Sequence, residues 1–138
     1  MDKSKKMQVN KNKSKIMIFN FTNNYKFSTR LSLQGENLQE VSETKLLGTT
    51  LTNNLKWHKN TERIIKKSNA RMQLLRVVSS FNPGWDDLKI IYVSFIRSLL
   101  EQSCTVWHSG LTQENTNDLE RVQKCALKII LKDSFKNY

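Results

Sequence analysis

The chain has 138 residues and a mass of 16.2 kDa, which fits one domain or two small ones and excludes a large multidomain enzyme. Hydrophobic residues make up 38% and charged residues 25%, a balance that can bury a core and excludes a wholly disordered chain. The net charge of +11 favours a polyanionic partner, with nucleic acid as the first candidate and an anionic membrane surface as the second.

The positive charge is concentrated in two blocks of the sequence. Residues 1–15 carry a net charge of +5 and residues 56–80 a net charge of +6, whereas the rest of the chain is neutral. Two cysteines do not make a disulfide framework, and no secretory signal opens the sequence. We therefore expect an intracellular chain that is not secreted, in the nucleus or the cytoplasm, with no membrane-spanning segment.

Composition and periodicity divide the chain into three parts. Residues 1–13 form a basic leader, residues 14–55 a β segment, and residues 56–138 a helical domain. The expected fold class is therefore α+β, with a short antiparallel β-sheet followed by a three-helix bundle.

Three or four short antiparallel strands are predicted in the β segment. The apolar run Ser14–Phe21 is typical of a buried strand, and the alternation over Tyr25–Gln34 of a half-buried one, with an Asn-Asn turn between them. Two shorter strands are predicted over Leu38–Val41 and Thr44–Leu51, with Gly48 inside the last. Apolar side chains around Met17, Phe19 and Phe21 would stay exposed on such a small sheet, so we expect the chain to associate.

Helical periodicity begins after residue 56. The first helix is predicted over His58–Ser80, ended by Asn82-Pro83-Gly84, and the second runs from near Asp86 to Gly110 at the latest. Thr112 is the predicted N-cap of the third helix. The apolar stripe of the first helix comprises Thr61, Ile64, Ile65, Ser68, Met72, Leu75 and Val78.

The first helix also carries the main candidate site, which we call the basic face: Lys56, Lys59, Arg63, Lys66 and Lys67. These residues lie away from the apolar stripe on a helical wheel, and Glu62 is the one acidic residue among them. Such a face can follow a phosphate backbone and release condensed counterions. A solvated polar face and a membrane-surface contact are the alternatives.

Other residue patterns favour a structural role over a catalytic or metal-binding one. Asp86-Asp87 is predicted to cap the second helix and complement its dipole. Cys104, His108, Cys125 and His58 lack the local spacing of a zinc site, so no metal site is predicted. The three tryptophans are predicted to seal the core, with base stacking by Trp57 as an alternative.

Several motifs, in order, resemble the reverse transcriptases (RNA-directed DNA polymerases) of non-LTR retrotransposons, the jockey-like and related transposable elements. These motifs are Asn10-Lys11-Asn12-Lys13-Ser14, Lys45-Leu46-Leu47-Gly48, Leu55-Lys56-Trp57, the run from Tyr92 to Ser98, and Val106-Trp107. The resemblance covers about residues 7–131 and implies the late palm followed by the thumb. It implies that Lys45, Leu47 and Gly48 support the primer end, and that the helices grip a primer–template duplex of RNA and DNA.

The chain departs from the family pattern where polymerisation is concerned. The aromatic-x-Asp-Asp turn that holds metal ions in this family is missing, so Mg²⁺ is expected only in a complete member and not as a cofactor of this chain. Thr52 stands where many relatives have Asp, and Gln102 where many have Tyr. The resemblance thus implies a non-catalytic fragment that binds nucleic acid non-specifically and has the rest of a polymerase as a further partner. A non-enzymatic basic interaction module and an inert pseudogene product are the alternatives.

Overall fold

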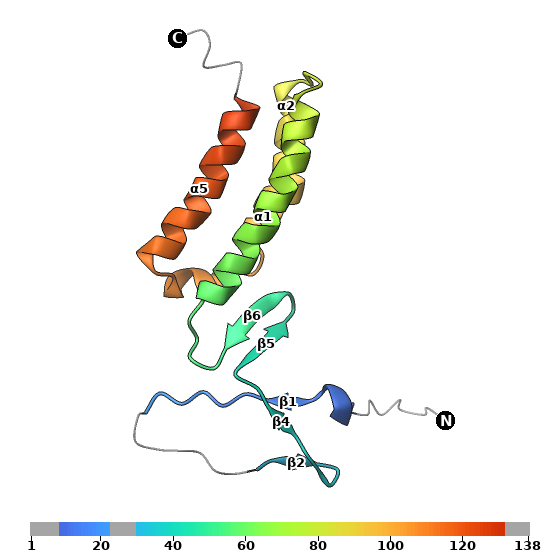
Figure 1. The fold of residues 1–138 in the computed structure, drawn as a ribbon, viewed down its shortest axis with the longest axis vertical. Coiled ribbons are helices and arrows are strands. Elements are labelled where there is room, and N and C mark those ends of the chain that lie inside the picture. The colour runs from blue at the N-terminus through green and yellow to red at the C-terminus, as the bar shows by residue number, and fades with distance from the viewer. Residues whose placement is uncertain (1–8, 23–29, 132–138) are drawn as a thin grey trace, which may run out of the picture.

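The computed structural model describes residues 9–22 and 30–131, which form an α+β fold (Figure 1). Short strand pairs occupy the first part of the chain, and helices occupy the rest. The predicted fold class is therefore confirmed. The hairpin nearest the helices lies between the bundle and the other strand pairs (Figure 1).

The strands form three separate two-stranded pairs instead of one sheet. After a 3₁₀ turn, η1 (Lys11–Lys13), strand β1 (Lys15–Ile16) pairs in parallel with β4 (Gln39–Glu40), and β2 (Ser32–Leu33) pairs antiparallel with β3 (Glu36–Asn37). The prediction of antiparallel pairing throughout was therefore wrong for β1. The predicted strand Ser14–Phe21 is paired over two residues only, because β4 offers no longer partner. The Asn-Asn turn and the first half of the predicted strand Tyr25–Gln34 lie outside the described residues, and β2 falls in its second half.

The apolar side chains of this first part are partly exposed, as predicted. Phe21 is 76% exposed and Phe19 43% exposed, while Met17 is half-buried. Two-residue strands bury little side-chain surface, which explains why these rings stay accessible to solvent.

The predicted single strand Thr44–Leu51 is instead a hairpin. Strand β5 (Glu43–Leu46) pairs antiparallel with β6 (Thr49–Thr52), and Leu46 lies opposite Thr49 across a two-residue turn. The turn residues Leu47 and Gly48 have φ of 48° and 86°, the positive values that a type I′ turn requires. Gly48 therefore reverses the chain, where the sequence pattern indicated only a bend.

The first helix, α1 (His58–Ser79), agrees with the prediction to within one residue. Its buried apolar residues are Ile64, Met72 and Leu75, and its buried polar residues are Asn60, Thr61 and Ser68. Asn82 takes a positive φ of 52° after the helix, which confirms that the Asn-Pro-Gly segment ends it. The stripe packs mainly against the last helix, α5 (Gln113–Ile130), which runs beside α1 (Figure 1).

The predicted second helix is divided into segments. These are α2 (Trp85–Ile91), a π-helical stretch η2 (Tyr92–Arg97), α3 (Ser98–Leu100), α4 (Cys104–Trp107) and a 3₁₀ turn η3 (His108–Gly110). Ser103 breaks the helix with a φ of 55°. The indole of the buried Trp107 donates to the Gln102 carbonyl at 2.9 Å, which holds this break in place.

Helix α5 (Gln113–Ile130) begins as predicted. The Thr112 hydroxyl accepts a hydrogen bond from the Asn115 N–H at 3.3 Å, so Thr112 is the N-cap. Val122 and Ala126 are buried against α1, and Leu119, Ile129 and Ile130 pack beside them. No helix of the described residues is long and apolar enough to span a membrane.

Candidate nucleic-acid interface

The basic face divides into two groups in the structure. Lys56, Lys66 and Lys67 are exposed, and within the described part of the chain none of their ammonium groups forms an ion pair. The first turn of α1 contains no acidic residue. These three lysines can therefore contact an external anion without breaking an internal bond.

Lys59 and Arg63 have structural partners instead. The Lys59 ammonium pairs with the Glu43 carboxylate on β5, and both side chains are about half exposed. The Arg63 guanidinium donates to Asn60 Oδ1 at 3.0 Å and is half-buried, with its Nε buried and unpartnered. Both cations still add positive potential to the surface, but their first partners belong to the fold.

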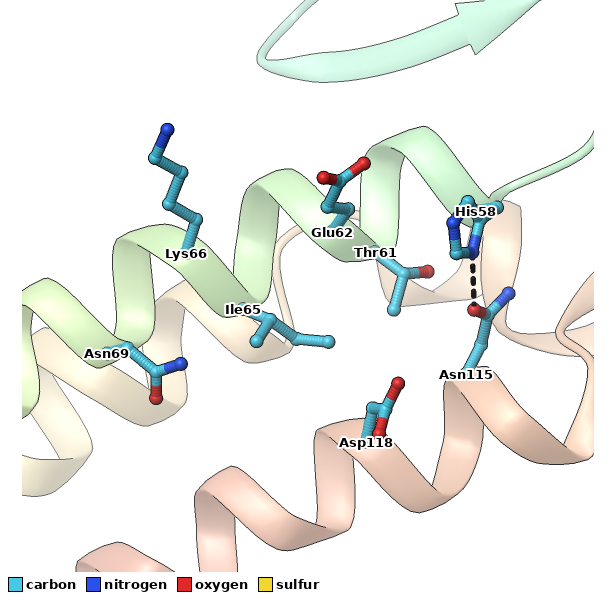
Figure 2. Close-up of a pocket in the computed structure, with 8 residues that line it drawn as sticks. All are labelled: His58, Thr61, Glu62, Ile65, Lys66, Asn69, Asn115 and Asp118. Carbon is cyan, nitrogen blue, oxygen red and sulfur yellow. Dashed lines mark hydrogen bonds between the residues drawn. The ribbon is translucent and has the colours of Figure 1, made fainter.

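A groove of about 410 Å³ runs along the other exposed side of α1, against α5 (Figure 2). Its lining residues are His58, Thr61, Glu62, Ile65, Lys66, Asn69, Asn115 and Asp118. His58 Nδ1 lies 3.2 Å from Asn115 Oδ1, which closes one end of the groove. Asp118 brings a carboxylate to this side from α5, whereas Glu62 and Lys66 both point away from α5 (Figure 2). Glu62 therefore lies on the same side of α1 as Lys66, within the basic face, and the carboxylate on the α5 side of the groove is that of Asp118.

The hairpin turn holds the residues that the resemblance implies for primer support. Lys45 is exposed on β5, and Leu47 is 88% exposed at the tip, where its positive φ is unfavourable for a side chain with a Cβ. Gly48 lies against Gln102, since a Cβ at position 48 would clash with Gln102 Nε2. Gln102 is, with Thr52, one of two positions at which this sequence departs from the pattern of the family that it resembles.

Three contacts attach the hairpin to the start of α1. The Thr50 N–H donates to Asn60 Oδ1 at 3.0 Å, and the Thr52 hydroxyl donates to the Lys56 carbonyl at 2.9 Å. The third contact is the pair between Glu43 and Lys59. Thr49, Thr50 and Thr52 are all buried as a result. The structure thus brings the hairpin residues and the basic face into one packed unit, across the predicted boundary at residue 55.

Sequence reasoning missed Asn60, Glu43 and Gln102. Asn60 offered a signal, because it lies four residues before Ile64 and so on the apolar stripe, where a polar residue requires a buried partner. Glu43 and Gln102 lie far from their partners in the sequence. No local pattern could have identified them.

The remaining candidates take structural positions. Trp57 and Trp107 are buried in the core, and Trp57 lies so close to Gly110 that a Cβ there would clash, so Trp57 has no face free for base stacking. Trp85 is 59% exposed, against the prediction that it seals the core, with Lys89 5.1 Å above its ring.

The acidic pair and the two cysteines occupy positions that assign them no catalytic or metal-binding role. Asp86 and Asp87 lie in the first turn of α2, where they complement its dipole, but Gly84 is the N-cap and no side chain caps it. The capping prediction was therefore wrong. Cys104 is partly buried against the core and Cys125 is exposed. Within the described residues, no three His, Cys, Asp or Glu side chains are grouped to hold a metal ion.

Comparison with known proteins found no similar protein: no family model, curated protein or solved structure matches this chain.

Proposed function

We propose that this chain binds a nucleic-acid duplex through its phosphates, by the amino-terminal half of α1 together with the adjoining hairpin turn. The observation that carries the proposal is the group Lys56, Lys66 and Lys67, three exposed lysines without an internal ion pair in the described chain. Each lysine that neutralises a phosphate releases a condensed counterion, which favours binding without reading sequence.

Charge placement supports this side of α1 over the groove side. Asp118 lines the groove and would repel a phosphate there, whereas on the basic face three exposed lysines outnumber Glu62, and the other nearby carboxylate, Glu43, is paired with Lys59. Lys59 and Arg63 raise the local potential, and the exposed lysines make the contacts.

The hairpin turn extends the proposed surface. Leu47 is exposed at a backbone angle that costs roughly 1–2 kcal/mol for a residue with a Cβ, and folding alone gives no reason to keep such a residue there. We assign Leu47, with Lys45 and Gly48, to contact with the sugar edge of the duplex next to the lysines, in line with the primer-end role that the resemblance implies.

The family resemblance gives the proposal its parent function, RNA-templated DNA synthesis by a reverse transcriptase of a non-LTR retrotransposon. The proposal for this chain is binding alone. The resemblance would require an aromatic-x-Asp-Asp turn for Mg²⁺-dependent polymerisation, and the sequence has none.

Two charge-reversal variants test the proposal against a general effect of net charge. K56E/K66E/K67E removes the exposed lysines of the basic face, and R76E/K124E/K128E reverses three exposed cations elsewhere on α1 and α5. Both variants lower the net charge by the same amount. We expect the first to weaken binding to an RNA–DNA hybrid by more than about tenfold in fluorescence anisotropy at low salt, and the second to have a much smaller effect.

Equal losses in the two variants would contradict a localised site. Tighter binding to anionic lipid vesicles or to an acidic polypeptide than to the hybrid duplex would instead support the alternative of a basic interaction module. Lys59 and Arg63 are left unchanged, because replacing either one would disturb the contacts that join α1 to the hairpin, whereas Lys124 of the second variant pairs only with Glu120, one turn away on the exposed side of α5.

A further inference from the structure

The outer face of α2 and η2 is an apolar surface with no partner in the described chain. Leu88 and Ile96 point inward and are buried, whereas Ile90 is 63% exposed and Val93 is 41% exposed. Single exposed apolar residues are ordinary on protein surfaces. Here the two line one shallow hollow of about 280 Å³, together with Asp86, Lys89 and Ser94.

Charges flank this hollow in a symmetric order along the chain. Asp86 precedes Ile90 by four residues, and Arg97 follows Val93 by four residues. Four residues correspond to about one helical turn, so each charge lies roughly one turn beyond its apolar neighbour. The face is thus acidic at its amino-terminal end, apolar in the middle and basic at its carboxy-terminal end, with one further cation, Lys89, held over the Trp85 ring next to Ile90.

Such an order is complementary to itself. If a second copy of the face is turned end to end, Ile90 meets Val93 of the other copy, and each Asp86 end meets an Arg97 end. This is the requirement of a two-fold interface, in which one patch contacts the same patch of the partner. A parallel arrangement would instead place like charges together.

Arg97 can reach such a partner while keeping its contact within the chain. Its Nε donates to Glu101 Oε1 at 2.7 Å, and its side chain remains 51% exposed. A guanidinium has five N–H donors, so one bond to Glu101 leaves donors for a second carboxylate. The π-helical turn that contains Arg97 keeps it near Val93, since the Ser98 N–H reaches back five residues to the Val93 carbonyl. Such turns are frequent at functional sites.

We propose that the α2–η2 face is a homodimer interface, in which two copies of this chain pack antiparallel through Ile90 and Val93, with Asp86 of each copy paired with Arg97 of the other. The interface involves one helical face per copy and is therefore small, so the dimer forms at micromolar or higher concentration. None of the interface residues belongs to the basic face, so a loss of dimerisation and a loss of nucleic-acid binding can be observed separately.

A charge exchange tests this arrangement directly. In D86R both ends of the face are basic, and in R97D both are acidic, so each variant alone should sediment as a monomer at concentrations where the wild type dimerises. An equimolar mixture of the two should recover the dimer, because the two basic ends of a D86R chain then meet the two acidic ends of an R97D chain. Sedimentation velocity over a concentration series measures all four samples.

Ile90→Glu provides an independent variant. Ile90 is largely exposed, so we expect I90E to fold like the wild type by circular dichroism and to remain monomeric. A wild type that is monomeric throughout the series would overturn the proposal. So would association that persists unchanged in I90E, which would point to the exposed Phe19 and Phe21, or a mixture of D86R and R97D that stays monomeric.

Discussion

Asn60 on α1 accepts a hydrogen bond from the backbone N–H of Thr50 on β6 at 3.0 Å, while its side chain is fully buried. The same Oδ1 atom accepts a bond from Arg63 at 3.0 Å. One side chain therefore fixes both the hairpin that presents Leu47 and a cation of the basic face. The relative position of the turn and the lysines depends on this contact.

Replacing Asn60 by Ala should destabilise the chain by about 1–3 kcal/mol, because the buried Thr50 N–H then loses its acceptor. Urea unfolding followed by circular dichroism measures the change. Asn69→Ala is the matched control, since Asn69 is exposed on the same helix and its replacement should change stability by less than about 0.5 kcal/mol. Equal effects of the two variants would show that Asn60 does not hold the hairpin.

Leu47→Asn should stabilise the hairpin by up to about 1 kcal/mol, because Asn tolerates positive φ better than Leu does. The same variant should weaken duplex binding, since it removes the exposed apolar tip. Thermal unfolding and fluorescence anisotropy separate the two effects. Leu46→Asn, one residue earlier on the strand, should give no such gain in stability; a variant L47N that binds as tightly as the wild type would remove Leu47 from the interface.

Gly48→Ala should destabilise the chain by about 1 kcal/mol, chiefly from its positive φ, with a smaller contribution from the new Cβ displacing the terminal amide of Gln102. In a Q102A background the clash disappears and only the backbone term remains. A double-mutant cycle by chemical unfolding should therefore show a smaller cost of G48A in that background. An identical cost in both backgrounds would mean that Gln102 does not constrain the turn.

The long helices could be predicted from the sequence because their signals are local. The stripe containing Ile64 and Leu75 repeats over several turns, and Thr112 precedes α5 in the position of a cap. The α2–η2 region was harder to predict from the sequence. Its apolar spacing continues through Ser103, but the positive φ of that residue and the widened turns depend on tertiary contacts, such as the Arg71 guanidinium donating to the Phe95 carbonyl at 2.6 Å.

The β segment was predicted least well, for a physical reason. Strands depend on partners that lie elsewhere in the chain, so short apolar runs such as Ser14–Phe21 do not reveal how many residues will pair. The residue pattern alone did not indicate the Leu47-Gly48 turn, because Asn or Asp, not Leu, normally precedes Gly there; only the resemblance to the family's Lys-x-Leu-Gly turn implied it. In the site, local charge density identified the five cations, but the pairing of Lys59 with Glu43 joins residues 16 positions apart.

The salt dependence of duplex binding is the most direct test of the central claim that exposed lysines of α1 contact phosphates. The logarithm of the association constant for an RNA–DNA hybrid, plotted against the logarithm of salt concentration, should fall linearly for the wild type. The slope should become shallower by about 2 to 3 in K56E/K66E/K67E, since each lost phosphate contact removes roughly 0.9. An unchanged slope in that variant, with R76E/K124E/K128E as the reference, would contradict the claim.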